Sequence, residues 1–148
     1  MKTILKAVLD AGAYLPERAH EDDAGLDLFT PENFTVPSHG TAAIDIGVHI
    51  EIPRGYVGLV KSKSGLYHKH DITVDGTIDA GYTGSIRIKL CNAGSFPYSF
   101  KRGDKIAQLV ILPIITPSLE VVNSLERTAR GDGGFGSTGD SVTDTKSE

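Results

Sequence analysis

The sequence predicts an all-β protein, and three observations carry this prediction. From Ile44 to Ile52 every second residue is β-branched and the residues between are polar or glycine, which is the period-2 pattern of a strand. Residues 84–90 repeat the pattern, and residues 106–112 form a nearly continuous apolar run of strand length. The 17 glycines and 7 prolines punctuate these runs at the short intervals typical of sandwiches and barrels.

Shorter runs complete the expected set of elements. Further strand candidates lie at residues 56–60, 72–74 and 119–122. Only residues 64–69 are interpreted as helix, over about a turn or two, because no long stretch shows the apolar stripe of an amphipathic helix. The expected fold class is therefore all-β with at most one short helix.

The composition of the chain changes at Arg127. Beyond it Gly, Ser, Thr and Asp predominate and Phe135 is the one aromatic residue, so the segment cannot bury enough apolar surface to order itself. We expect a β-barrel domain over residues 1–126, a mobile C-terminal arm over residues 127–139 and a disordered tail over residues 140–148.

Composition also excludes several classes of protein. Fifteen Lys and Arg against nineteen Asp and Glu give a net charge of −4, which provides no global positive field for a nucleic-acid duplex or an anionic membrane. Cys91 is the single cysteine, so an internal disulfide is excluded and a thiolate metal site is disfavoured. The first apolar run ends at Asp10, too short for a secretory signal or a membrane span. We expect a soluble, cytoplasmic protein without a nucleic-acid or membrane partner.

The most specific local motif is the glycine-rich run over residues 130–139. Its glycines allow successive main-chain N–H groups to converge on an anion, and Arg130, Ser137 and Thr138 add side-chain donors. The spacing approaches that of a P-loop, but Ser137 stands where the P-loop lysine is required. Phe135 can stack on a base. The run is interpreted as a phosphate cradle, with a disordered Gly-Ser tail as the alternative.

A second motif, residues 75–84, is a glycine-punctuated turn between two expected strands. A hairpin at this position would expose main-chain amides that can bond the edge of a flat ligand. Asp79 can orient a water molecule, and Tyr82 can pack on a sugar. An ordinary β-turn is the alternative.

Three further segments carry polar residues suited to a phosphorylated ligand. Residues 61–66 place two lysines and two serines beside Gly65, which suits a polyphosphate, although solvated charge at a strand end is the alternative. Asp27, among apolar neighbours, can hold a hydrated magnesium ion or cap a turn. In the segment of residues 103–109, Gln108 is a polar amide inside an apolar strand and must find hydrogen-bond partners.

In this order and at these separations, the five segments resemble the five motifs of the trimeric dUTPase family. The matching segments are residues 24–28, 63–66, 76–84, 103–109 and 130–139. The resemblance implies a jelly-roll-like β-barrel, the dUTPase-like β-clip, in a homotrimer whose three active sites are each built from three chains. It also implies Mg²⁺-dependent hydrolysis of dUTP to dUMP and pyrophosphate by attack of water on the α-phosphorus. That reaction keeps uracil out of DNA and supplies dUMP for thymidylate synthesis.

The same resemblance implies roles for individual residues. Asp79 is the expected catalytic residue, activating the attacking water, and Asp27 is expected to bind magnesium through water. Tyr82 would pack on the deoxyribose and exclude a 2′-hydroxyl, and Phe135 would cover the uracil. The expected substrate-binding residues are Lys63, Ser64, Gly65, Gly76, Ile78, Tyr82, Gln108, Arg130, Phe135, Gly136, Ser137 and Thr138.

Three residues depart from the family pattern. Lys63 stands where arginine is usual, and an ammonium cannot grip a phosphate bidentately. Gly81 stands where a second acid is frequent, and Thr83 where arginine is common. Two other functions remain open from the sequence. A dCTP deaminase shares the barrel but needs a catalytic glutamate, and a non-catalytic trimeric β module could bind a nucleotide or a protein.

Overall fold

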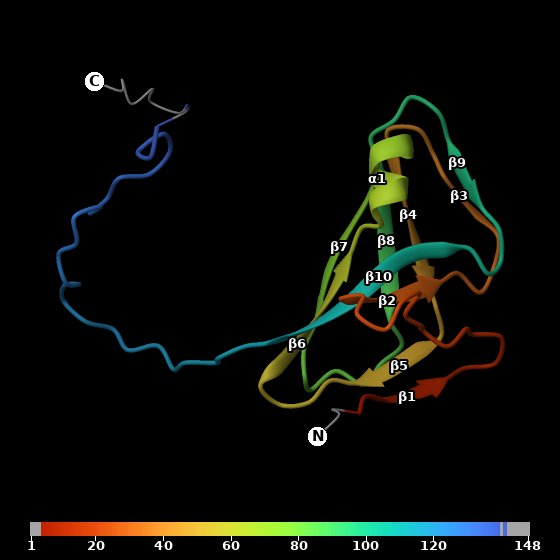
Figure 1. The fold of residues 1–148 in the computed structure, drawn as a ribbon, viewed down its shortest axis with the longest axis horizontal. Helices are drawn as coiled ribbons and strands as arrows, with labels where there is room; N and C mark the ends of the chain where they lie inside the picture. Colours follow the sequence, from red (N-terminus) through yellow and green to blue (C-terminus); the bar gives the residue numbers. More distant parts are fainter. Residues whose placement is uncertain (1–3, 140, 142–148) are drawn as a thin grey trace. The chain divides into compact units, whose positions relative to one another are not determined.

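The computed structural model describes residues 4–139 and 141, and the expected all-β architecture is confirmed (Figure 1). All strand pairs are antiparallel. The elements in chain order are β1 (Lys6–Leu9), β2 (Gly25–Phe29), β3 (Phe34–Val36), β4 (Gly40–Asp45), β5 (Val48–Glu51), β6 (Tyr56–Lys61), α1 (Ser64–His70), β7 (Ile72–Ile78), β8 (Arg87–Asn92), β9 (Tyr98–Phe100) and β10 (Lys105–Pro113).

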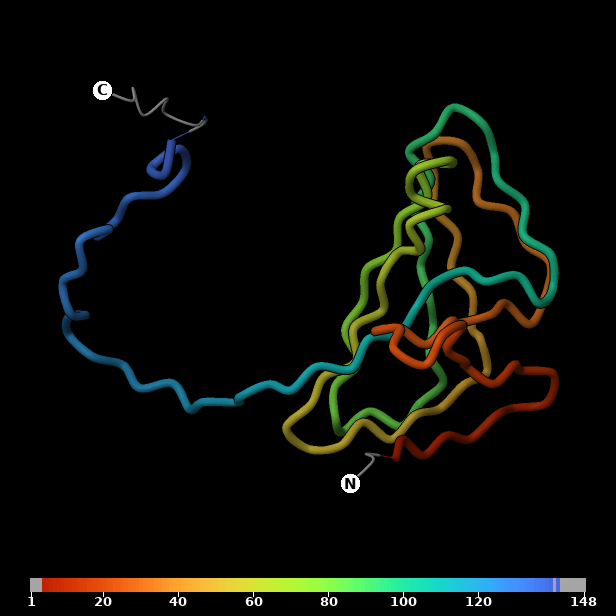
Figure 2. Tube along the Cα trace, in the orientation of Figure 1, coloured from red at the N-terminus to blue at the C-terminus, as the bar shows by residue number. Residues whose placement is uncertain are grey.

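Most strands join one six-stranded sheet, in the order β2-β10-β6-β7-β8-β4. Two ribbons, β1-β5 and β3-β9, complete the described strands. Figure 2 shows the orange segment of β2 alongside the teal segment of β10, although the two are far apart in the sequence. The sheet therefore pairs the second strand of the chain with the last described strand.

Alternation of side chains along the strands builds the core. β8 buries Ile88 and Leu90 and exposes Arg87 and Lys89, as period 2 requires. Burial of each large aliphatic side chain contributes about 1.5–3 kcal/mol relative to exposure. The largest fully buried apolar side chains are Leu28, Ile46, Ile52, Ile72, Ile88, Leu90, Ile106 and Leu109.

The expected strand over residues 44–52 is wrong as a single element, because it is divided between β4 and β5. Gly47 adopts φ +66°, the left-handed conformation that glycine tolerates, and its N–H donates to the Asp45 carboxylate at 3.0 Å. The break lets β4 pair with β8 while β5 pairs with β1. The strand candidate at residues 119–122 is also wrong, since the described ladders end at Pro113.

Helix α1 confirms the expected short helix and has clear ends. Lys63 precedes it in an extended conformation. Asp71 ends it with φ +54° and donates its N–H to the carbonyls of Leu66 and Tyr67. In the described part of the chain, no helix is long and apolar enough to cross a membrane.

The chain divides into two compact units, Met1–Thr116 and Pro117–Glu148. In the second unit, successive turns shape the glycine-rich run: Gly133 N–H donates to the Arg130 carbonyl at 3.0 Å, and Ser137 N–H to the Gly134 carbonyl at 3.0 Å. The predicted boundary after residue 126 stays a prediction. The predicted tail over residues 140–148 lies outside the described residues, apart from residue 141.

Candidate active site

A pocket of about 230 Å³ opens where strands β7 and β8 separate. The two strands pair only from Ile72 to Val74, and beyond Val74 strand β7 keeps its ladder with β6 alone. Residues 75–78 of β7 therefore have no partner residues in the β7–β8 ladder. Their main-chain groups on that edge can bond the edge of a flat ligand. Four of the residues expected from the sequence line this pocket: Gly76, Ile78, Asp79 and Tyr82.

Contacts within the turn after β7 hold the Tyr82 ring in place. The Tyr82 N–H donates to the Asp79 carbonyl at 3.0 Å, and the Tyr82 hydroxyl donates to the Ser85 carbonyl at 2.8 Å. The ring lies directly over Gly84, where a Cβ would come within 2.5 Å of the Tyr82 Oη. Half-exposed and fixed by the turn, the ring is available as a flat wall for a ligand.

The first, second and fourth sequence motifs meet on β2, β10 and the end of β6. Asp27 on β2 is the cross-strand partner of Gln108 on β10, and Gln108 is in turn the partner of Lys61 on β6. The Gln108 amide donates to the Ser62 carbonyl at 2.9 Å, which satisfies the polar group that the sequence left without a partner. The sheet order thus gathers residues that are far apart in the chain.

Two lysines contact the Asp27 carboxylate. Lys63 Nζ donates to Asp27 Oδ1, and Lys105 Nζ lies 2.7 Å from Oδ2. Burial acts to raise the pKa of Asp27, but the bonds from Lys105 and Lys63 outweigh it and hold that pKa below its ordinary value of 3.8. Asp27 is therefore ionised at neutral pH although it is only 6% exposed. Sequence reasoning missed Lys105, whose signal was its place inside the fourth motif.

This donor set limits how magnesium can be held. Among the described residues, no three His, Cys, Asp or Glu side chains gather as a metal-binding group. Mg²⁺ usually keeps several waters and binds through substrate phosphates with one or two carboxylates. The single carboxylate of Asp27, next to Gln108 and Lys63, fits such an ion contacted through water. It does not fit a cage built by the protein alone.

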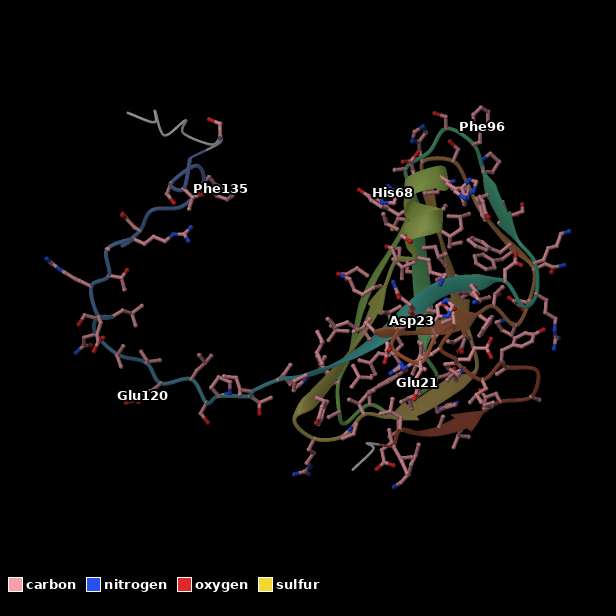
Figure 3. All side chains as sticks on the ribbon, viewed as in Figure 1. Glu21, Asp23, His68, Phe96, Glu120 and Phe135 are labelled. Atoms are coloured by element: carbon pink, nitrogen blue, oxygen red, sulfur yellow. The ribbon has the colours of Figure 1, made fainter. Side chains whose placement is uncertain are left out.

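The residues of the glycine-rich run lie in the second unit of the chain. Arg130 Nε donates to the Gly133 carbonyl at 3.0 Å, and Gly136 adopts φ +78°. Phe135, labelled in Figure 3, is fully exposed. Its ring is free to cover a ligand.

Asp79 and the lysine–carboxylate cluster lie at opposite ends of the β6–β7 ladder. Asp79 follows the end where Ile78 pairs with Gly58, whereas Lys63 follows the end where Asp75 pairs with Lys61. Along β6, six residues of extended chain separate the position opposite Asp79 from Lys63. At the usual rise of a strand, this separation is roughly 20 Å. The compact unit thus brings the expected residues together in two groups, not in one.

The family model described as dUTPase matches residues 11–139. The deoxyuridine 5'-triphosphate nucleotidohydrolase of Clostridium acetobutylicum is 45% identical over 134 residues, covering 88% of this chain and 92% of that protein. The protein of the same name from Paramecium bursaria Chlorella virus 1 is 42% identical over 140 residues, covering 94% of this chain and 99% of its own.

Solved structures agree with these sequence relatives. A dUTPase mutant of Staphylococcus bacteriophage 80alpha, solved with dUpNHpp, has a TM-score of 0.87 and 34% identity, covering 94% of this chain and 100% of that one. A mutant dUTPase from phage phi11 of S. aureus, reported with a structural Mg(II) ion, has a TM-score of 0.78 and 34% identity, covering 84% and 100%. The chain belongs to the dUTPase family. This confirms the expected fold and the expected enzyme class, a dUTP diphosphatase.

Proposed function

We propose that this dUTPase cleaves dUTP between the α and β phosphates, giving dUMP and pyrophosphate, with Mg²⁺ as cofactor. The observation that carries the proposal is the β7–β8 pocket, which Asp79 and Tyr82 line together. The relative from bacteriophage 80alpha was solved with dUpNHpp, which supports a uracil nucleotide as the ligand. In this role the enzyme keeps uracil out of DNA and supplies dUMP for thymidylate synthesis.

The residues of the pocket divide the chemical work. Asp79 accepts a proton from the water that attacks the α-phosphorus, a contribution of about 10²–10⁴ in rate for a positioned general base. The Tyr82 ring packs on the deoxyribose and leaves no space for a 2′-hydroxyl. Main-chain groups of residues 75–78, including Gly76 and Ile78, bond the uracil edge.

The second group of residues receives the phosphates. Ser64 and Gly65 open helix α1, and Gln108 faces Asp27 across the β2–β10 ladder. When the triphosphate binds, the Lys63 side chain turns from Asp27 toward the phosphates. Lys105 stays in contact with the Asp27 carboxylate. Asp27 would hold Mg²⁺ through water here, and the ion would supply positive charge against the phosphates.

We further propose a homotrimer with shared active sites. One chain holds Asp79 and the phosphate-binding group roughly 20 Å apart along the ladder, so a single site needs one group from each of two chains. Apolar side chains after the last strand also remain in water: Leu119, Val121 and Leu125 are 100%, 98% and 86% exposed. Exposed apolar side chains of this kind favour a protein contact.

Subunit mixing tests the shared site. Chains carrying Asp79→Asn and chains ending at Ala129 should each retain little activity, and a mixture should regain part of the activity because some sites receive an intact set of residues. Sedimentation should give a trimer. A monodisperse, active monomer would contradict the proposal.

The glycine-rich run serves as a lid in this proposal. Arg130, Ser137 and Thr138 contact the phosphates, and Phe135 covers the uracil. Ordering such a segment costs about 1–2 kcal/mol per residue, so closure needs both the base and the triphosphate. The chain has no tryptophan, so Phe135→Trp introduces a single indole whose emission should change when a non-hydrolysable dUTP analogue binds.

Product analysis tests the proposed reaction directly. The purified protein should release pyrophosphate from dUTP, and much more slowly from dCTP, dTTP or UTP. Release of ammonia from dCTP would instead show deamination. Binding of dUTP without any product would indicate a non-catalytic module.

A further inference from the structure

His49, outside the five sequence motifs, joins the substrate-binding turn to the rest of the barrel. Its Nδ1 lies 2.9 Å from the Thr83 carbonyl oxygen, in the turn that carries Asp79 and Tyr82. Its Nε2 lies 3.2 Å from both carboxylate oxygens of Asp10, in the segment between β1 and β2. One ring on β5 therefore connects two loops that are far apart in the sequence.

This contact is a hydrogen-bonded link from the turn to another element. Among the hydrogen bonds of the described residues, the other bonds of residues 79–84 run to the turn itself or to Ser85. The carbonyl that His49 contacts belongs to the residue directly after Tyr82. A change at His49 thus reaches the Tyr82 ring through one peptide unit.

The chemistry of the two partners determines the protonation state of the ring. A backbone carbonyl oxygen and a carboxylate both accept hydrogen bonds and donate none. Neutral imidazole has one N–H, so it can satisfy Thr83 or Asp10 but not both, whereas imidazolium donates to both. The observed geometry is therefore the geometry of the charged ring.

We propose that His49, as an imidazolium, is a positioning residue that holds the Tyr82 turn ready for substrate, and that its deprotonation weakens dUTP binding. The proposal rests on the proposed function, in which Tyr82 packs on the deoxyribose. Neutral His49 has one N–H for two acceptors, so the turn loses its bond in those molecules where that N–H faces Asp10, and it must then be ordered when substrate binds. The cost falls on KM, because the bound substrate itself orders the turn before chemistry.

Charges from several elements surround the ring. Asp10 contacts it directly, and the Asp45 carboxylate at the end of β4 also favours the charged form. The Asp45 carboxylate also forms an ion pair with Arg87 of β8, at 4.0 Å. Lys6 of β1 forms an ion pair with Glu51 of β5, at 3.1 Å. The charges of Asp10 and Asp45 both favour the protonated ring.

The direction of the pH effect follows from these contacts. The bond to the Thr83 carbonyl, then the bond to Asp10, raise the pKa of His49 above its ordinary value of 6.5. The two-bond arrangement is therefore fully present below pH 6.5 and is lost as the pH rises through the raised value. Since the side chain is 28% exposed, it exchanges protons with the solvent.

NMR of the full-length protein with ¹⁵N-labelled histidine tests the ring itself. His49 should have a pKa above the ordinary value of 6.5 and should carry both ring protons below its pKa. Asp10→Asn removes the charged acceptor while its main-chain bond to Gly47 remains, so the His49 titration should move to lower pH. A pKa of His49 at or below 6.5 would overturn the proposal.

Steady-state hydrolysis of dUTP across neutral and alkaline pH tests the consequence. In the unmodified enzyme KM should rise about two- to tenfold as His49 loses its proton, the range of one net hydrogen bond, with kcat nearly constant. His49→Gln donates to Thr83 at every pH, so this rise should disappear. Asp10→Asn should move it to lower pH, and His20→Gln should leave it unchanged.

The outcomes separate this proposal from the proposed function. The same pH dependence of KM in the unmodified enzyme and in His49→Gln would overturn the role of His49 while dUTP hydrolysis stands. Failure to hydrolyse dUTP at any pH would contradict the proposed function. In that case the NMR titration would still decide whether His49 holds the turn as an imidazolium.

Discussion

Replacing Gly84 by alanine displaces the Tyr82 ring without changing any residue that contacts substrate. The added Cβ would lie 2.5 Å from the Tyr82 Oη, 2.6 Å from Cζ and 2.9 Å from Cε2. Ordinary contacts begin near 3.5 Å, so the ring must move by about 1 Å. Gly84 is not among the glycines with positive φ, and the backbone therefore accepts alanine.

The expected effect is large on binding and catalysis and small on folding. Tyr82 is 46% exposed, so its ring can swing into solvent, and the fold loses at most about 1 kcal/mol with the bond to the Ser85 carbonyl. A misplacement of about 1 Å in a substrate-positioning group can cost up to about 100-fold in rate. We expect kcat/KM for dUTP to fall about 10- to 100-fold. Selectivity against UTP should fall with it.

Steady-state assays with dUTP and UTP, together with urea unfolding, measure both quantities. Gly81→Ala is the matched control, because it lies in the same turn and a Cβ there meets nothing within 4 Å. Tyr82→Phe removes the hydroxyl and keeps the ring, so it should retain most of the selectivity. The reasoning is refuted if Gly84→Ala keeps the unmodified kcat/KM for dUTP and the unmodified dUTP-to-UTP ratio.

Other expected outcomes test the remaining parts of the site. Asp79→Asn should bind dUTP with nearly unchanged affinity and lower turnover by about 10²–10⁴; near-normal turnover would contradict its assignment as general base. A chain ending at Ala129 should keep the barrel and the trimer but lose most activity, while a chain ending at Gly139 should match the full length; equal rates for both truncations would rule out the lid. Because the folded pKa of Asp27 lies below 3.8, its ion pairs should stabilise the fold above that pH and lose this contribution as the pH falls through the folded value. In denaturant titrations, Asp27→Asn should therefore weaken the fall of the free energy of unfolding at acid pH. An unchanged fall would show that these ion pairs contribute nothing to stability.

Local patterns in the sequence were sufficient to predict much of the molecule. The apolar run over residues 106–112 became β10, and the short helix expected over residues 64–69 became α1, because strand period and helix termini depend on neighbouring residues. The acid and the aromatic of the third motif could be named from composition of the turn alone. Their presence in one pocket follows from their closeness in the chain.

Tertiary structure decided what depends on distant partners. The alternation from Ile44 to Ile52 is continuous, yet β4 and β5 separate at Gly47 because their partner strands, β8 and β1, lie in different sheets. The pocket itself arises where a ladder ends, and no local pattern encodes the end of a pairing.

Charged contacts show the same division. Asp27 was recognisable from sequence as an unusual acid, but its partner Lys105 comes from another strand, and the link from His49 to Thr83 crosses between elements. The chemical groups of a side chain are known from the sequence alone. Its hydrogen-bond partners, burial and pKa depend on which strands the fold places beside it, and these only the tertiary structure determines.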